Sequence, residues 1–162
     1  MPGKIVAVGA ALGAAALVAG WALVGPARET PPLLAWQDAQ TVARGEAIYA
    51  GECAACHGPL GEAAADPAPG AAPAHDATGH TWRHPDYALV QLTRSGEAAD
   101  FCRTLDEAGM PRFSDSLGDR EILDVLAYIK STWPEDIRAA QEELNLLHRA
   151  QNEAYRALLA EQ

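Results

Sequence analysis

The chain has 162 residues and a formal net charge of −10 at pH 7, from 22 acidic and 12 basic side chains. This length accommodates one modest domain with appendages rather than two full domains, and the acidic balance argues against nucleic acid as a partner, because phosphate binding requires a basic face. Three cysteines are an odd number, which speaks against a fully paired disulfide scaffold, and aromatic residues make up only 6% of the sequence. Any core is therefore small, or is completed by a group that the sequence does not encode.

The N-terminal stretch from Ile5 to Val24 carries no charged residue. A helix of this length spans about 30 Å, the thickness of the hydrocarbon core of a bilayer. Gly25-Pro26-Ala27 also resembles a signal-peptide cleavage site. Residues 1–25 are therefore interpreted as an uncleaved membrane anchor or, as the alternative, a secretory signal. Both interpretations export the rest of the chain, and Lys4 favours a cytoplasmic N-terminus.

Residues 26–35 are rich in proline and predict an extended linker. Asp38 then has the character of an N-cap, because apolar residues follow it at helical spacing. These residues are Val42, Ala43, Ala47, Ile48 and Tyr49. The sequence therefore predicts a helix that begins after Asp38.

The segment Cys53-Ala54-Ala55-Cys56-His57 has the pattern C-x-x-C-H, which is typical of c-type haem attachment. Two thiols one helical turn apart can each bond a vinyl group of one haem, and the adjacent imidazole then reaches the iron. The alternatives fit less well, because a redox dithiol belongs in a βαβ setting and a zinc site requires further ligands at ordinary spacing. Cys53 and Cys56 are therefore predicted to hold one haem c covalently, with His57 as an axial ligand.

Residues 58–85 show no sustained periodicity and hold several prolines and glycines, which predicts a long loop. The second half of this loop is unusually rich in histidine. The histidines concerned are His75, His80 and His84. In one interpretation, Trp82 and one or two of these histidines pack beside the haem and form hydrogen bonds to its propionates. Another has them bind a second metal, such as copper, with Asp76 or Asp86, and a third leaves them as solvated loop residues.

A short helix is predicted from Pro85 or Asp86 to Ser95, with Gly96 as its C-terminal stop. Met110 follows in the segment Gly109-Met110-Pro111, and the only other methionine is Met1. A lone methionine is usually core filler. Here proline stiffens a loop just before the last helix of the predicted haem domain, so Met110 is predicted to be the second axial ligand of the iron.

Ser116 or Asp119 is predicted to cap a strongly periodic helix, which Trp133-Pro134 ends. Residues 134–162 predict a further helical stretch, interrupted at Gln151. This extension either folds back onto the haem domain or serves as a docking element for a larger complex. Cys102, the odd cysteine, is expected to be a small buried side chain. The sequence predicts no strand.

Over roughly residues 38–133 the chain resembles the class I c-type cytochromes, in their bacterial membrane-anchored form. The segments that carry the resemblance are Gly45-x-x-x-Tyr49, then Cys53-x-x-Cys56-His57, then Gly109-Met110-Pro111-x-Phe113, and last Val125-Leu126-Ala127-Tyr128-Ile129. The resemblance implies an all-α fold, in which the first and last helices cross and loops wrap one covalent haem with His/Met ligation. At the crossing, Gly45 and Tyr49 would meet Val125 and Tyr128.

The resemblance also implies that a proline carbonyl accepts the ring N–H of His57 and so fixes its tautomer. Pro69 and Pro73 are both candidates for this role. The expected organisation has four parts. They are a membrane anchor or signal (1–25), a linker (26–35), a cytochrome c haem domain (36–133) and a C-terminal helical extension (134–162).

With His57 and Met110 both on the iron, no coordination position is left for a substrate. The chain is therefore expected to be a one-electron carrier and not an enzyme. The expected partners are membrane respiratory complexes, such as a quinol-oxidising complex and a terminal oxidase, on the periplasmic side of a bacterial cytoplasmic membrane. The alternatives are a copper-handling or sensing haem protein, based on the three loop histidines, and a fixed haem subunit of a dehydrogenase or oxidase.

Overall fold

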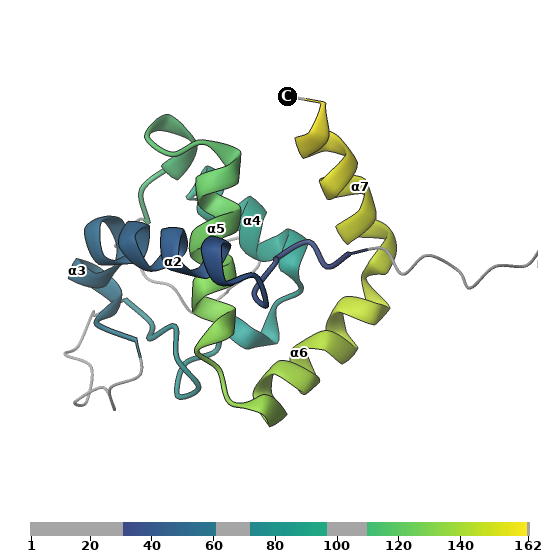
Figure 1. The fold of residues 1–162 in the computed structure, drawn as a ribbon, viewed down its shortest axis with the longest axis horizontal. Helices are drawn as coiled ribbons and strands as arrows, with labels where there is room; N and C mark the ends of the chain where they lie inside the picture. The colour runs from purple at the N-terminus through teal and green to yellow at the C-terminus, as the bar shows by residue number, and fades with distance from the viewer. Residues whose placement is uncertain (1–30, 61–71, 97–109, 162) are drawn as a thin grey trace, which may run out of the picture. The chain divides into compact units, whose positions relative to one another are not determined.

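The computed structural model describes residues 31–60, 72–96 and 110–161 (Figure 1). The chain divides into two units, Met1–Pro31 and Pro32–Gln162, and the second contains nearly all of the described residues. These residues are helical or irregular and include no strand, in agreement with the predicted all-α class. Among them, no helix is long and apolar enough to cross a membrane. The predicted anchor, Pro69 and Cys102 lie outside the described residues.

The described helices follow the predicted order along the chain. They are α2 (Ala39–Ile48), the π-helical turn η1 (Tyr49–Cys53), α3 (Ala54–His57), the 3-10 turn η2 (Thr81–Arg83), α4 (Asp86–Ser95), the 3-10 turn η4 (Phe113–Asp115), α5 (Asp119–Ser131), α6 (Glu135–Leu147) and α7 (Arg149–Ala160). Asp38 caps α2 as predicted, because its side chain accepts a 2.8 Å hydrogen bond from the Thr41 amide. Gly96 ends α4, and Pro134 precedes α6, also as predicted.

The cap of α5 differs from the prediction. Its N-cap is Gly118, not Ser116 or Asp119. The side chain of Glu121, three residues on, accepts a 2.8 Å hydrogen bond from the Gly118 amide. This contact is the Glu half of a capping box, and it satisfies an end amide from inside the helix. A polar side chain at the cap itself is therefore not required.

The C-terminal extension is two helices, not one stretch interrupted at Gln151. The break falls at His148, whose φ of −108° and ψ of 25° leave the helical region. Neither glycine nor proline marks this position, so the sequence pattern does not reveal it. The bend turns α7 back toward α4, where Asn152 makes a tertiary hydrogen bond to the Tyr87 amide.

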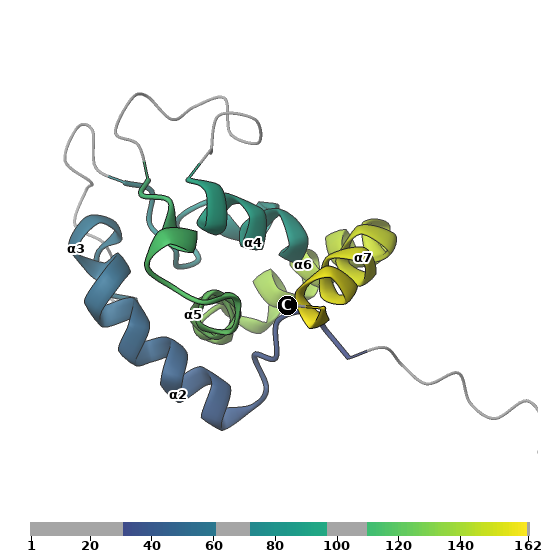
Figure 2. The same ribbon diagram turned by 90° about the horizontal axis from the view of Figure 1, so that it is seen from above.

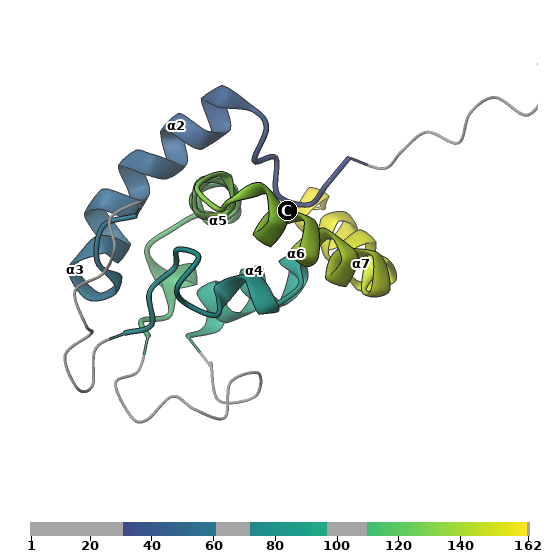
Figure 3. The same cartoon turned by 90° about the horizontal axis from the view of Figure 1, so that it is seen from below.

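Helices α2 and α5 cross at Gly45, as the resemblance implies. A Cβ atom at this glycine would lie 2.8 Å from Tyr128 Cβ and closer still to the carbonyl oxygen of Asp124. Only glycine therefore permits the observed approach of the two helices. Beside the crossing, the rings of Tyr49 and Tyr128 meet edge to face, with centroids 5.7 Å apart. Figures 2 and 3 show α5 end-on, between α2 on one side and α4 on the other.

The apolar core lies between these three helices and the chain that enters α2. Its buried members are Leu33, Leu34, Tyr49, Cys53, Leu89, Val90, Phe113, Ile122, Val125, Leu126, Ala127, Ile129 and Trp133. Trp133 is 1% exposed, and its indole N–H donates a 2.8 Å hydrogen bond to the carbonyl oxygen of His75. Trp133, which follows the C-cap of α5, thus also holds the histidine-rich loop.

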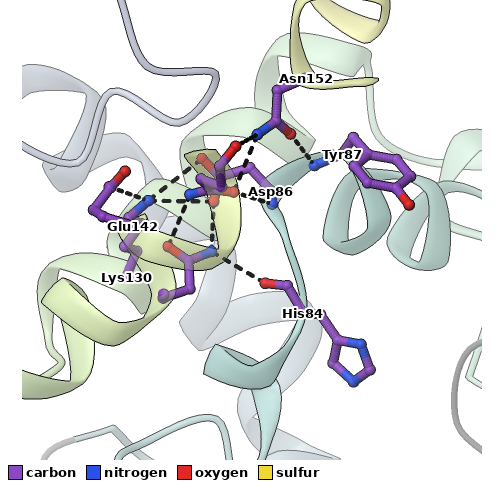
Figure 4. A network of polar contacts seen from close by, with 8 residues as sticks. His84, Asp86, Tyr87, Lys130, Glu142 and Asn152 are labelled. Atoms are coloured by element: carbon purple, nitrogen blue, oxygen red, sulfur yellow. Dashed lines mark hydrogen bonds and ion pairs between the residues drawn. The ribbon is translucent and has the colours of Figure 1, made fainter. Parts of the chain in front are cut away.

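A buried polar network joins the extension to α4 and α5 (Figure 4). Lys130 on α5 is completely buried, and its ammonium lies 3.2 Å from Asp86 and 2.6 Å from Glu142. The Gln141 amide donates to Asp86 at 2.6 Å and to the His84 carbonyl at 3.2 Å. Buried charges are tolerated where they are paired and hydrogen-bonded in this way. The extension therefore folds back onto the domain, as one of the two interpretations predicted.

Candidate functional site

The C-x-x-C-H motif lies where α2 passes into η1 and α3. The Ala54 amide donates a hydrogen bond to the Tyr49 carbonyl, five residues back, so the backbone widens by one residue where the motif begins. Single π-helical turns of this kind occur often at functional sites. Cys53 is buried and Cys56 is exposed, and neither forms a disulfide within the described residues. Burial is the main cause that raises the pKa of the Cys53 thiol to about 11.

The ring of His57 is held in one orientation by the backbone of the following loop. Its Nδ1 lies 2.7 Å from the carbonyl oxygen of Pro73. A carbonyl can only accept, so Nδ1 carries the proton and Nε2 keeps its lone pair. Burial lowers the pKa of His57, although the Pro73 carbonyl acts in the opposite direction. The result is a neutral imidazole with a free Nε2, which is the form that binds iron.

Three of the four predicted site residues, Cys53, His57 and Met110, line one cavity, which is partly open to solvent. The other residues that line it are Pro73, His75, His80, Thr81, His84, Leu89, Leu92, Thr93, Val125, Leu126 and Ile129. Thus α4 and α5 supply a largely apolar wall, and the loop after α3 supplies imidazoles. Cys56, the fourth predicted residue, lies outside this lining.

The loop that carries Met110 packs on the end of α4. Gly96 has a φ of +69°, in the left-handed region that favours glycine. A Cβ atom at Gly96 would lie 2.5 Å from the carbonyl oxygen of Met110 and 3.1 Å from that of Pro111. The sequence pattern identifies Gly96 only as the residue that ends a helix. Its contact with the Met110 loop is visible only in the three-dimensional structure.

The family model of cytochrome c matches residues 42–133, more than half of the chain. The chain belongs to the cytochrome c family. No curated protein and no solved structure gives a significant match. As a family member, this cytochrome carries covalently bound haem c and is a haem-based electron carrier. The described residues fit that group, because an apolar cavity, a buried thiol and a neutral imidazole with a free Nε2 meet at one place.

The three loop histidines of this cytochrome all line the cavity, but their ring contacts differ. His75 stacks on His57, with ring centroids 3.9 Å apart, whereas His80 and His84 lie beside each other at 5.8 Å. In the part of the chain that the structure describes, no group of three or more His, Cys, Asp or Glu side chains is placed to hold a metal ion. The copper interpretation is therefore not supported.

Neighbouring polar side chains of the cytochrome are also engaged elsewhere. The Asp86 carboxylate accepts from Lys130 and Gln141. Asp76 accepts from both the amide and the hydroxyl of Thr78. The indole N–H of Trp82 donates to the Gly79 carbonyl at 3.0 Å, within its own loop. These contacts argue against the two aspartates as metal ligands and against this indole as a haem propionate donor.

Proposed function

We propose that Cys53 and Cys56 form the thioether bonds to haem c, and that His57 and Met110 are the axial ligands of its iron. The observation that carries this proposal is that His57 and Met110 line the same cavity, and that the His57 imidazole is neutral with Nε2 free. When bound, the haem supplies one-electron chemistry at its iron.

The residues of the chain would support that chemistry by holding the ligands still. The Pro73 carbonyl keeps the proton of His57 on Nδ1, and Gly96 seats the backbone of the Met110 loop. Thioether ligation raises the reduction potential relative to two imidazoles, and the largely apolar wall from α4 and α5 acts in the same direction by disfavouring the extra charge of the oxidised state. With both axial positions filled, the protein transfers electrons and binds no substrate at the iron.

The proposed setting is the periplasmic side of a bacterial cytoplasmic membrane. Support comes from the uncharged stretch Ile5–Val24, from the linker that follows it, and from a haem attachment motif typical of exported chains. There the protein would pass electrons between a quinol-oxidising complex and a terminal oxidase or a similar acceptor, through brief contacts of small area.

Optical spectra of the oxidised holoprotein test the ligand assignment. Met110→Ala is expected to abolish the weak long-wavelength band that marks sulfur ligation of the iron. Leu92→Ala is the control, since Leu92 lines the same cavity but offers no ligand atom, and it should keep the band. A Met110→Ala protein with the unchanged band would refute the assignment.

Covalent attachment is tested separately by the mass of the purified, denatured chain. Cys53→Ser and Cys56→Ser should each leave the haem on a single thioether, and the double variant should lose it on denaturation. Retention of haem by the denatured double variant would show that other residues hold it.

The location and partners require the full chain in its own membranes. Deletion of residues 1–25, with an unrelated cleavable secretion signal in their place, should move the cytochrome from the membrane fraction to the soluble periplasmic fraction. Membranes that contain the full chain should reduce it with quinol and reoxidise it with oxygen. A cytochrome that co-purifies in fixed stoichiometry with a dehydrogenase or an oxidase would show a fixed subunit instead of a shuttle.

A further inference from the structure

The imidazole of His75 lies face to face with the imidazole of His57. The ring centroids are 3.9 Å apart, and the planes are inclined by 26°. This contact is of a different kind from the hydrogen bond between His57 and Pro73, because it touches the flat face of the ring and not its edge. His75 also lines the cavity.

His75 is itself fixed from several directions. Its Nδ1 lies 2.8 Å from the hydroxyl oxygen of Thr81, a buried residue. Its backbone carbonyl accepts a 2.8 Å hydrogen bond from the buried indole of Trp133. The ring of Tyr49 approaches it edge-on at 6.2 Å. A ring held in this way can restrain the orientation of a side chain that stacks on it.

One hydrogen bond at an edge does not fix the orientation of a planar ring. The hydrogen bond from His57 to Pro73 restrains the ring at one edge only, and because it tolerates a range of angles, the ring can still rock about its Cβ–Cγ bond. A stacked ring opposes that motion, because tilting would separate the two faces or drive them together. We propose that His75 is a positioning residue that sets the plane of the His57 imidazole. The inference rests on the proposed role of His57 as an iron ligand.

The orientation of an axial imidazole plane can be observed in the oxidised holoprotein. It governs the spread of the g-values in electron paramagnetic resonance and the pattern of haem methyl shifts in proton NMR. His75→Leu removes the stacked ring and is expected to change both. His75→Phe restores a flat ring at this position and should return both observables most of the way to those of the unsubstituted protein.

His80→Leu is the matched control, since His80 lines the same cavity and is close to His84 rather than stacked on His57. It should leave the g-values and the methyl pattern close to those of the unsubstituted protein. Equal changes in His75→Leu and His80→Leu would overturn the inference, because they would report a general loss of cavity polarity. Unchanged observables in His75→Leu would overturn it as well.

Thr81→Val covers the case in which His75→Leu does not assemble with haem. This variant keeps the imidazole but removes its hydroxyl partner, so the stacked ring should loosen and the methyl shifts should move in part. No movement would overturn the inference. These results are distinct from a failure of the proposed ligation, which would appear in the unsubstituted protein as a spectrum without histidine and methionine on the iron.

Discussion

The backbone amide of Tyr87, at the start of α4, donates a 2.9 Å hydrogen bond to the side-chain oxygen of Asn152 in α7. The preceding amide, that of Asp86, donates to Asn145 in α6 at 2.8 Å. The local N-cap of α4 is Pro85, whose side chain makes no capping hydrogen bond. The first amides of a helix require acceptors from outside it. The C-terminal extension provides them here, to a helix that lines the cavity.

Asn152→Ala is therefore expected to lower the free energy of unfolding by about 1–2 kcal/mol, since it leaves a helix-end amide without its acceptor. Denaturant unfolding of the holoprotein measures this change. Gln151→Ala is the control, because Gln151 is the exposed neighbour on the same helix, and it should have little effect. Equal stability of the two variants would contradict the capping role.

Lys130→Met is expected to destabilise the fold by about 3–5 kcal/mol, because it leaves the carboxylate of Asp86 buried without its cation. Lys130 is 0% exposed and Asp86 is 1% exposed. Arg44→Met is the comparison, since the Arg44 side chain in the pair with Asp124 is 41% exposed and solvent screens the interaction. In thermal unfolding, the melting temperature should fall by a large amount for Lys130→Met and by a small amount for Arg44→Met. Comparable falls would mean that burial does not govern the strength of the Lys130 pair.

Gly45→Ala should lower the free energy of unfolding by about 1–3 kcal/mol, because the added methyl group must push α2 away from α5. Gly51→Ala offers a control within the adjoining η1 turn, where a Cβ atom would meet nothing within 4 Å. That variant should be as stable as the unsubstituted protein, or more stable by up to about 1 kcal/mol. If Gly45→Ala proved as stable as Gly51→Ala, the close crossing of the helices would be wrong.

Gly96→Ala is expected to weaken the proposed bond between Met110 and the iron, because the new methyl group meets the carbonyl oxygen of Met110. The oxidised protein should lose part of its long-wavelength band. Gly96→Asn separates the two causes of strain, since asparagine tolerates a positive φ but carries the same Cβ atom. Both variants should lose part of the band. A band lost only in Gly96→Ala would assign the effect to backbone strain alone.

Local chemistry made much of the fold predictable. Asp38 is a good helix cap, Gly96 and Pro134 are strong helix breakers, and the apolar period of α5 is clear over its whole length, so the helices were found near their observed bounds. The break at His148 and the cap at Gly118 are not visible in the sequence pattern. The first depends on a tertiary contact of α7, and the second on a side chain three residues inside the helix.

For the site, the chemistry is predictable from short segments, because C-x-x-C-H supplies two thiols and an imidazole, and the lone methionine in a proline loop is the residue proposed as the further ligand. The tertiary structure alone decided what surrounds them. Two prolines were open as the acceptor for His57, and the fold places the carbonyl of Pro73 at 2.7 Å. Three histidines were equivalent in the sequence, and the fold stacks only His75 on His57. The physical reason is that ligand type is a property of single residues, whereas orientation depends on contacts between residues far apart in the chain, such as that of Trp133 with His75.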